Sequence, residues 1–153
     1  MSTLGKVTGV NGNLITVEFE DAVALNEVGY AIVDGLTLMS EIVRIKGRRC
    51  DMQVYEDTSG IKCGDRVEFT GELLSVELGP GLLTQVFDGL QNPLPKLAEE
   101  CGFFLQRGKY IDALPRDVEW DFTPSVKTGD LVFAGDPVGS VPEAGKHPDD
   151  QQI

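Results

Sequence analysis

The feature that most constrains the fold is a succession of short alternating segments between residues 5 and 74. Two of them, GKVTGV (5–10) and LITVEF (14–19), flank an Asn-Gly-Asn turn at 11–13, which predicts a β-hairpin. Further strands are expected at 30–35, 36–47, 48–56 and 66–73. Strands spaced about 8 to 12 residues apart fit a small closed antiparallel barrel. Closure would remove exposed sheet edges.

Two departures from simple alternation carry local predictions. Ile42 and Val43 interrupt the pattern of their segment, which indicates a bend or a β-bulge. The next segment, SVELGPGLLTQVFDGLQNPL (75–94), mixes glycines and prolines with apolar residues. Its residues 82–87 fit either a short helix or a buried extended connector. A helix is expected at 95–101, begun by a cap at Asn92 or by Pro95 and ended by Gly102.

From residue 103 onward the pattern predicts strands again, in FFLQRGKY (103–110), VEWDFTP (118–124) and KTGDLVFAGDPVGSV (127–141). KCGDRVEF (62–69) is echoed by KTGDLVFA (127–134), and both indicate a tight turn at Gly-Asp followed by a strand. Residues beyond about 141 are expected to be disordered. The predicted fold class is mainly β. A barrel (1–72) is followed by a connector with a short helix (73–102) and a partial β-sandwich-like bulge (103–153).

Composition excludes several functions. The net charge of −12 opposes binding to nucleic acids and to anionic membrane surfaces. The basic cluster at residues 44–49 is interpreted as the solvated face of a strand. No apolar run approaches the roughly 20 residues of a membrane span. The cysteines, at positions 50, 63 and 101, match no zinc or redox spacing and are interpreted as reduced thiols.

No catalytic, cofactor-binding or metal-binding residue is predicted in this chain. GSVPEAGK (139–146) departs from a phosphate-binding loop, because its glycines are too far apart and His147 replaces the required Ser or Thr. The acidic pairs at 56–57 and 99–100 are interpreted as solvated faces. GDLVFAGDPVGSV resembles the hammerhead sandwich of biotinyl and lipoyl carrier domains. It contains no lysine to modify.

Longer stretches carry a resemblance to a known family. QVYEDTSGIKCG (53–64), TGELLSVELGPGLL (70–83) and FDGLQ (87–91) are followed by FLQRGKYIDAL (104–114) and EWDFTPSVKTGDLVFAGDPVGSV (119–141). In this order they resemble the N-terminal part of the catalytic A subunit of V-type and archaeal-type rotary ATPases. The resemblance extends from residue 5 to about 141. It implies that this chain corresponds to a piece of a longer subunit.

The resemblance also implies partners and a location. The barrel would lie in the crown of a hetero-hexameric head with alternating B subunits, and barrel and bulge would meet the peripheral stalk. The complex would be cytoplasmic and peripheral on the membrane. The full-length subunit would bind ATP or ADP with Mg²⁺ and couple ATP synthesis or hydrolysis to H⁺ or Na⁺ transport. This chain, which shows no P-loop, is expected to be inactive alone.

The candidate site residues are structural or interface positions. Asp88 is expected to bond backbone N–H groups of the connector, with Gly89 taking a positive φ; alternatively, Asp88 is only a turn former. The full set is Gly79, Pro80, Gly81, Phe87, Asp88, Gly89, Gln91, Arg107 and Gly108. One other hypothesis remains open, a free-standing barrel-and-sandwich binding module without catalysis. An independent enzyme is not supported, because no converging acid, base and nucleophile are found.

Overall fold

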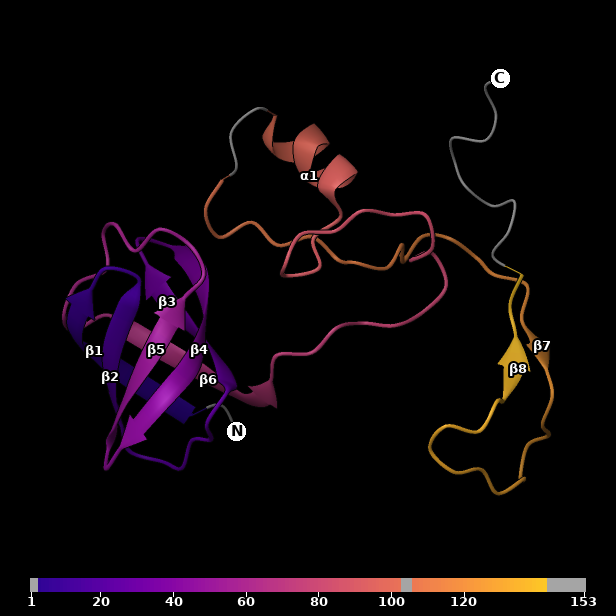
Figure 1. The fold of residues 1–153 in the computed structure, drawn as a ribbon, viewed down its shortest axis with the longest axis horizontal. Helices are drawn as coiled ribbons and strands as arrows, with labels where there is room; N and C mark the ends of the chain where they lie inside the picture. The colour runs from indigo at the N-terminus through magenta and orange to yellow at the C-terminus, as the bar shows by residue number, and fades with distance from the viewer. Residues whose placement is uncertain (1–2, 103–105, 143–153) are drawn as a thin grey trace. The chain divides into compact units, whose positions relative to one another are not determined.

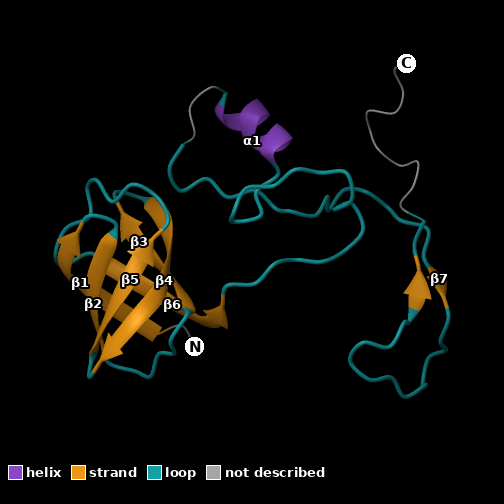
Figure 2. Cartoon of the chain, viewed as in Figure 1, coloured by secondary structure: helices purple, strands orange, loops and turns teal. Residues whose placement is uncertain are grey.

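A closed antiparallel β-barrel forms the first part of the computed structural model, which describes residues 3–102 and 106–142 (Figures 1 and 2). Its strands are β1 (Thr3–Asn11), β2 (Leu14–Phe19), β3 (Glu27–Val33), β4 (Leu36–Lys46), β5 (Arg49–Val54) and β6 (Arg66–Leu73). They follow the order β1-β2-β5-β4-β3-β6, and β6 pairs with β1 to close the barrel. The barrel predicted from alternation is confirmed.

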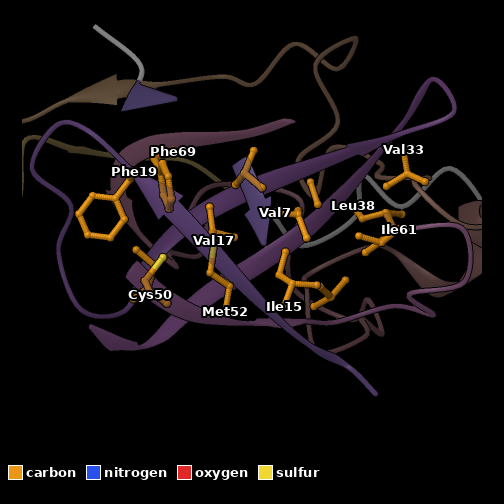
Figure 3. Packing of buried hydrophobic residues seen from close by; sticks show 14 residues of the cluster. Val7, Ile15, Val17, Phe19, Val33, Leu38, Cys50, Met52, Ile61 and Phe69 are labelled. Atoms are coloured by element: carbon orange, nitrogen blue, oxygen red, sulfur yellow. The ribbon is translucent and has the colours of Figure 1, made fainter. Parts of the chain in front are cut away.

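The barrel interior is filled by apolar side chains from all six strands (Figure 3). Phe69, which is fully buried, meets Phe19 edge to face with ring centroids 6.1 Å apart. Ile15, Val17 and Met52 are also fully buried. The inward positions are those that the alternating pattern marks as apolar, so burial of one face per strand selects the register.

The predicted irregularity in the fourth strand is a β-bulge. Pairing between β4 and β5 shifts between Ile42 and Arg44, so Val43 has no opposite residue. A similar shift occurs in β1 between Val7 and Gly9. Where β3 pairs with β6, the extra residues lie on β6, between Phe69 and Leu73. Bulges increase local twist and bend, which helps a sheet this small to close.

A buried carboxylate, which the sequence analysis did not single out, lies where β3 pairs with β6. Glu27 begins β3 and is 4% exposed. Its Oε1 accepts the Gly71 N–H of β6 at 2.8 Å, and its Oε2 accepts the Ala24 N–H at 2.8 Å. Such charge-assisted bonds offset the cost of burying the carboxylate. Glu27 therefore ties the preceding loop to the last strand.

The rest of the described chain contains little regular structure. Helix α1 (Leu94–Cys101) confirms the predicted helix, and Gly102 follows it with φ +67°, as expected of a C-terminal cap. The strands predicted after residue 103 are largely wrong: the described residues there contain only β7 (Thr123–Pro124) and β8 (Gly139–Ser140). Residues 103–105 and the tail from 143, including His147, lie outside the described residues.

The predicted alternatives for residues 82–87 are both wrong. The N–H of Gln85 bonds to the carbonyl of Leu82 at 3.3 Å, and Thr84 has φ +68°, so the segment is a turn rather than a helix. Leu83 and Val86 are mostly exposed rather than buried. Leu82 and Phe87 are only half-buried, so the segment is not a buried connector.

The chain divides into two compact units that do not follow its linear order. The first contains the residues up to Ser75 together with Cys101–Tyr110, and the second contains Val76–Glu100 together with the residues from Ile111 onward. The predicted boundaries at 72 and 102 stay a prediction. The segment 106–110 nevertheless belongs with the barrel in space, although it follows the helix in sequence.

Candidate functional site

Asp88 organises a small hairpin in the second unit. Its Oδ1 accepts the N–H groups of Leu90 at 2.9 Å and Asn92 at 2.8 Å, and its Oδ2 accepts the Asn92 side-chain amide at 2.9 Å. The expected bonds from Asp88 to backbone N–H groups are confirmed. Asp88 also starts the turn, because its carbonyl accepts the Gln91 N–H at 3.2 Å. The two interpretations of Asp88 therefore describe one arrangement.

The expected positive φ at Gly89 is wrong. Gln91 has φ +63°, whereas Gly89 is not among the residues with positive φ. The Asp88 N–H bonds to the Asn92 carbonyl at 3.1 Å, and Phe87 forms a β-bridge with Pro93. This is a three-residue hairpin loop, in which a type I turn is followed by one residue in the left-handed region. The left-handed residue is the last of the loop, not the first.

Gln91 compensates for that conformation with its side chain. Its Oε1 accepts the Glu77 N–H at 2.7 Å, and its Nε2 donates to the Glu77 carbonyl at 2.7 Å. The side-chain amide thus pairs with one residue of extended backbone as a neighbouring strand would. The Glu77 carboxylate in turn accepts the Arg116 guanidinium at 2.7 and 2.9 Å.

Asn92 is a member of this site whose role the sequence analysis missed. It is 4% exposed, and its Oδ1 accepts the Ile111 N–H at 2.9 Å. Together with its bonds to Asp88, this contact fixes the start of the segment that follows Tyr110. Its side chain is therefore used away from the helix, and the predicted cap at Asn92 is wrong. An Asn directly before a Pro offered only a capping signal, and nothing local indicated the contact 19 residues away.

The Gly79-Pro80-Gly81 triplet allows a close approach of two segments. A Cβ on Gly79 would lie 3.0 Å from the Leu114 side chain. A Cβ on Gly81 would lie 2.7 Å from the Pro115 ring, and Gly81 has φ +100°. Side chains at both positions would therefore collide or strain the backbone. The triplet packs on residues 114–115 rather than serving only to turn the chain.

Arg107 and Gly108 lie with the barrel. The Gly108 N–H bonds to Glu56 Oε2 at 2.6 Å, and a Cβ on Gly108 would lie 3.3 Å from the Thr37 carbonyl oxygen. Tyr110 donates its hydroxyl to Glu56 Oε1 at 2.7 Å. Nε and Nη2 of Arg107 are buried, without a hydrogen-bond partner among the described residues. The candidate residues thus fall into two groups, one in each unit.

Acidic Gly-Asp turns recur in both units. In each, an aspartate accepts the N–H of the residue three positions earlier: Asp65 from Lys62 at 2.7 Å, Asp130 from Lys127 at 2.8 Å, and Asp136 from Phe133 at 2.9 Å. The preceding glycine has a φ of +96° to +104°, as the third position of a type II turn requires. The echoed turn is confirmed. A strand follows only Asp65.

The contacts described so far order the backbone of both units. Among the described residues, no group of three or more His, Cys, Asp or Glu side chains is placed to hold a metal ion. The three cysteines are free thiols, and burial, followed by the charges of Asp51 and Glu27, raises the pKa of Cys50 to about 12. In the described ranges no helix is long and apolar enough to cross a membrane.

Comparison with known proteins gives two separate family matches. Residues 7–71 match the ATP synthase alpha/beta family, beta-barrel domain, and residues 111–148 match the ATPsynthase alpha/beta subunit barrel-sandwich domain. The chain is 61% identical over 141 residues to the V-type ATP synthase alpha chain of Treponema denticola. It is 59% identical over 141 residues to V-type ATP synthase alpha chain 1 of Treponema pallidum.

A third relative, the V-type ATP synthase alpha chain of Borreliella burgdorferi, is 56% identical over 147 residues. These matches cover 92% to 96% of the chain but only 24% to 26% of the relatives. The chain therefore spans about a quarter of the length of the curated relatives that it matches, and it corresponds to their N-terminal part.

Proposed function

Because the chain belongs to the ATP synthase alpha/beta family, we propose that it is the N-terminal, non-catalytic portion of a V-type ATP synthase alpha subunit. The observation that carries this proposal is the barrel of residues 3–73, matched as the family's β-barrel domain, within 59% to 61% identity to alpha chains along nearly the whole sequence. The free-standing binding module is not favoured by these relatives.

The work of this portion is assembly. Within a rotary complex, the barrel would contact alternating B subunits in the crown of a hetero-hexamer, and barrel and bulge would contact the peripheral stalk. The complex would lie on the cytoplasmic side, peripheral to the membrane. The complete subunit would couple ATP synthesis or hydrolysis to H⁺ or Na⁺ transport.

ATP, ADP and Mg²⁺ do not fit the residues described. The carboxylates of Glu27, Glu56 and Asp88 are each engaged by N–H donors of this chain. No phosphate-binding loop occurs in the sequence, and the described residues contain no metal-binding cluster. We therefore assign nucleotide and Mg²⁺ to other parts of the complete subunit.

A domain exchange tests the proposal. Residues 1–141 of this chain would replace the aligned residues of the Treponema denticola alpha chain, co-expressed with the other subunits of its complex. We expect the chimera to assemble, seen by native mass spectrometry, and to retain ATPase activity within about twofold. The same exchange from Treponema pallidum alpha chain 1 is the matched control.

The opposite outcome is equally clear. If the chimeric subunit is folded and binds nucleotide but does not join the complex while the control does, the assembly role is wrong. Isothermal titration of ATP with Mg²⁺ into the 153-residue chain is a second test. We expect no binding there, and saturable binding would contradict the assignment of nucleotide to other parts of the subunit.

A further inference from the structure

Residues 106–110, here called the strap, return to the barrel after the chain has left it. The chain leaves the first compact unit after Ser75 and returns to it at Cys101–Tyr110. Strap and barrel are joined at Glu56, which lies two residues after the end of β5. Glu56 accepts the Gly108 N–H at 2.6 Å on one oxygen and the Tyr110 O–H at 2.7 Å on the other.

The Tyr110 hydroxyl also completes the barrel ladder. Ser40 and Val54 are the last paired residues of β4 and β5. The Met39 N–H, one residue further along, donates to the Tyr110 oxygen at 2.7 Å. The hydroxyl therefore accepts a bond that a longer β5 would have accepted, and it donates its own O–H hydrogen bond to Glu56. A single carboxylate is the acceptor on which these contacts depend.

The strap is held by hydrogen bonds rather than by apolar burial. None of its residues is buried; Arg107, Gly108 and Tyr110 are half-buried, and Gln106 and Lys109 are exposed. Little hydrophobic area therefore opposes release, and the charge-assisted bonds to Glu56 supply the attachment. By contrast, barrel strands are held by a continuous apolar core. Strap and barrel should open independently.

We propose that residues 106–110 form a releasable strap that Glu56 fastens to the barrel, so that loss of this one contact frees the strap while the barrel stays folded. Fastening closes the intervening residues 76–100 into a loop with both ends on one unit. Closing a chain of this length lowers the entropy of the free loop. The strap thereby restricts the connector, and its release is a conformational step available to the subunit.

Arg107 gives the strap a second, electrostatic link to the same corner of the barrel. The pKa of the Asp57 carboxyl is lowered, first by hydrogen bonds from Ser59 and in smaller part by the Arg107 charge. Asp57 directly follows Glu56 in the sequence. The Arg107 charge of the fastened strap thus favours the ionised form of a carboxyl on the barrel.

Hydrogen exchange on the 153-residue chain tests the strap. In Glu56→Gln and Tyr110→Phe, we expect the amides of Gly108 and Met39 to exchange at least tenfold faster than in the unchanged chain. The amides of Val7 and Phe19, which bond to the carbonyls of Asp65 and Arg48 at 2.9 and 3.1 Å beside β6 and β5, report on barrel unfolding and should keep their protection. Tyr55→Phe is the matched control. It removes a similar bond, from Tyr55 to Glu41 at 2.6 Å, without touching the strap.

Hydrogen exchange and proteolysis distinguish a releasable strap from a strap that unfolds together with the barrel. Faster exchange at Gly108 and Met39 alone supports the strap, as does faster tryptic cleavage after Arg107 and Lys109 relative to cleavage after Lys127. Unchanged exchange at Gly108 in both variants would overturn it. Equal loss of protection in strap and barrel would also overturn it, because strap and barrel would then be one cooperative unit.

Discussion

The barrel and the second unit are stabilised by different kinds of side-chain interaction. The barrel buries a continuous cluster of apolar residues from six strands. In the second unit, the buried apolar residues among those described are Pro93, Leu97 and Ala113. Its segments are instead joined by side-chain groups of Asp88, Gln91 and Asn92 that bond to backbone or to each other. One region is ordered by removal of apolar area from water, the other by satisfied backbone groups.

This difference matters because the two kinds of order are lost in different ways. Apolar burial is shared among many residues, so the barrel should unfold as one unit. Polar contacts to backbone are few and individually replaceable, so the second unit should open locally. The variants below would test that contrast, starting with the largest expected effect.

Phe69→Ala should produce the largest loss of stability. It removes a fully buried ring that packs on Phe19, and such truncations cost about 3–5 kcal/mol. Chemical denaturation followed by circular dichroism would measure the change in the free energy of unfolding. Leu131→Ala, at a position that is 82% exposed, is the control and should change it by less than about 0.5 kcal/mol. Equal effects from the two variants would mean that the barrel core is not the source of stability.

Asp88→Ala should have a smaller and local effect. It leaves the Leu90 and Asn92 N–H groups and the Asn92 amide without their acceptor, at a cost of about 1–3 kcal/mol. Hydrogen exchange should show lost protection at Leu90 and Asn92, while barrel amides keep theirs. Glu99→Ala, on exposed helix surface, is the control. A matching loss in the barrel would break the proposed separation of the two regions.

The repeated Gly-Asp turn allows the same change to be made in both regions. Asp65→Ala and Asp130→Ala each remove one bond to a backbone N–H, of 2.7 and 2.8 Å. Because Asp65 directly precedes β6, its loss should lower barrel stability by about 0.5–1.5 kcal/mol. Asp130→Ala should leave the barrel transition unchanged. A comparable shift from Asp130→Ala in denaturant titrations would show that the turns are coupled.

The smallest expected effect on the barrel comes from alkaline pH. Burial, reinforced by the hydrogen bond to Glu56, raises the pKa of the Tyr110 hydroxyl above its ordinary value of 10.0. A raised pKa means that the fold favours the neutral hydroxyl. Its contribution is complete below pH 10 and is lost as pH rises through the folded pKa.

We therefore expect strap protection at Gly108 to fall above pH 10, with exchange corrected for its intrinsic dependence on pH. Tyr110→Phe should remove that extra dependence. Tyr55, whose pKa is raised to about 12, first by burial and then by Glu41, remains in both proteins. A pH dependence that persists in Tyr110→Phe would assign the effect to Tyr55 or to another group.

The sequence predicted the barrel because each strand repeats the same alternation of apolar and polar residues. Alternation in LITVEF, and its interruption at Ile42 and Val43, were sufficient to anticipate the strand and the bulge. The hairpin at Asp88 was predicted only in part, since the aspartate indicated a turn but the loop length decides which residue takes positive φ. That residue is Gln91 rather than Gly89, because it is the last of the three loop residues.

Polar contacts between residues far apart in the sequence could not be predicted from local sequence patterns. Glu27 and Glu56 are ordinary charged residues in the sequence, and their partners lie 44 and 52 positions away at Gly71 and Gly108. The strands predicted after residue 103 failed for a related reason. Apolar alternation predicts a strand only where another layer can cover it, and Leu131 and Phe133 are mostly exposed in the structure.

Closure of the barrel by its last strand has a consequence for synthesis on the ribosome. Because β6 pairs with both β1 and β3, a nascent chain ending before Arg66 can at most form an open sheet with two unprotected edges. Contacts such as Thr3 with Phe69 join distant residues, and such contacts form slowly. Until Leu73 has left the exit tunnel, the emerging strands offer edges to neighbouring chains. This interval is when a chaperone that covers β-edges would have most to contribute.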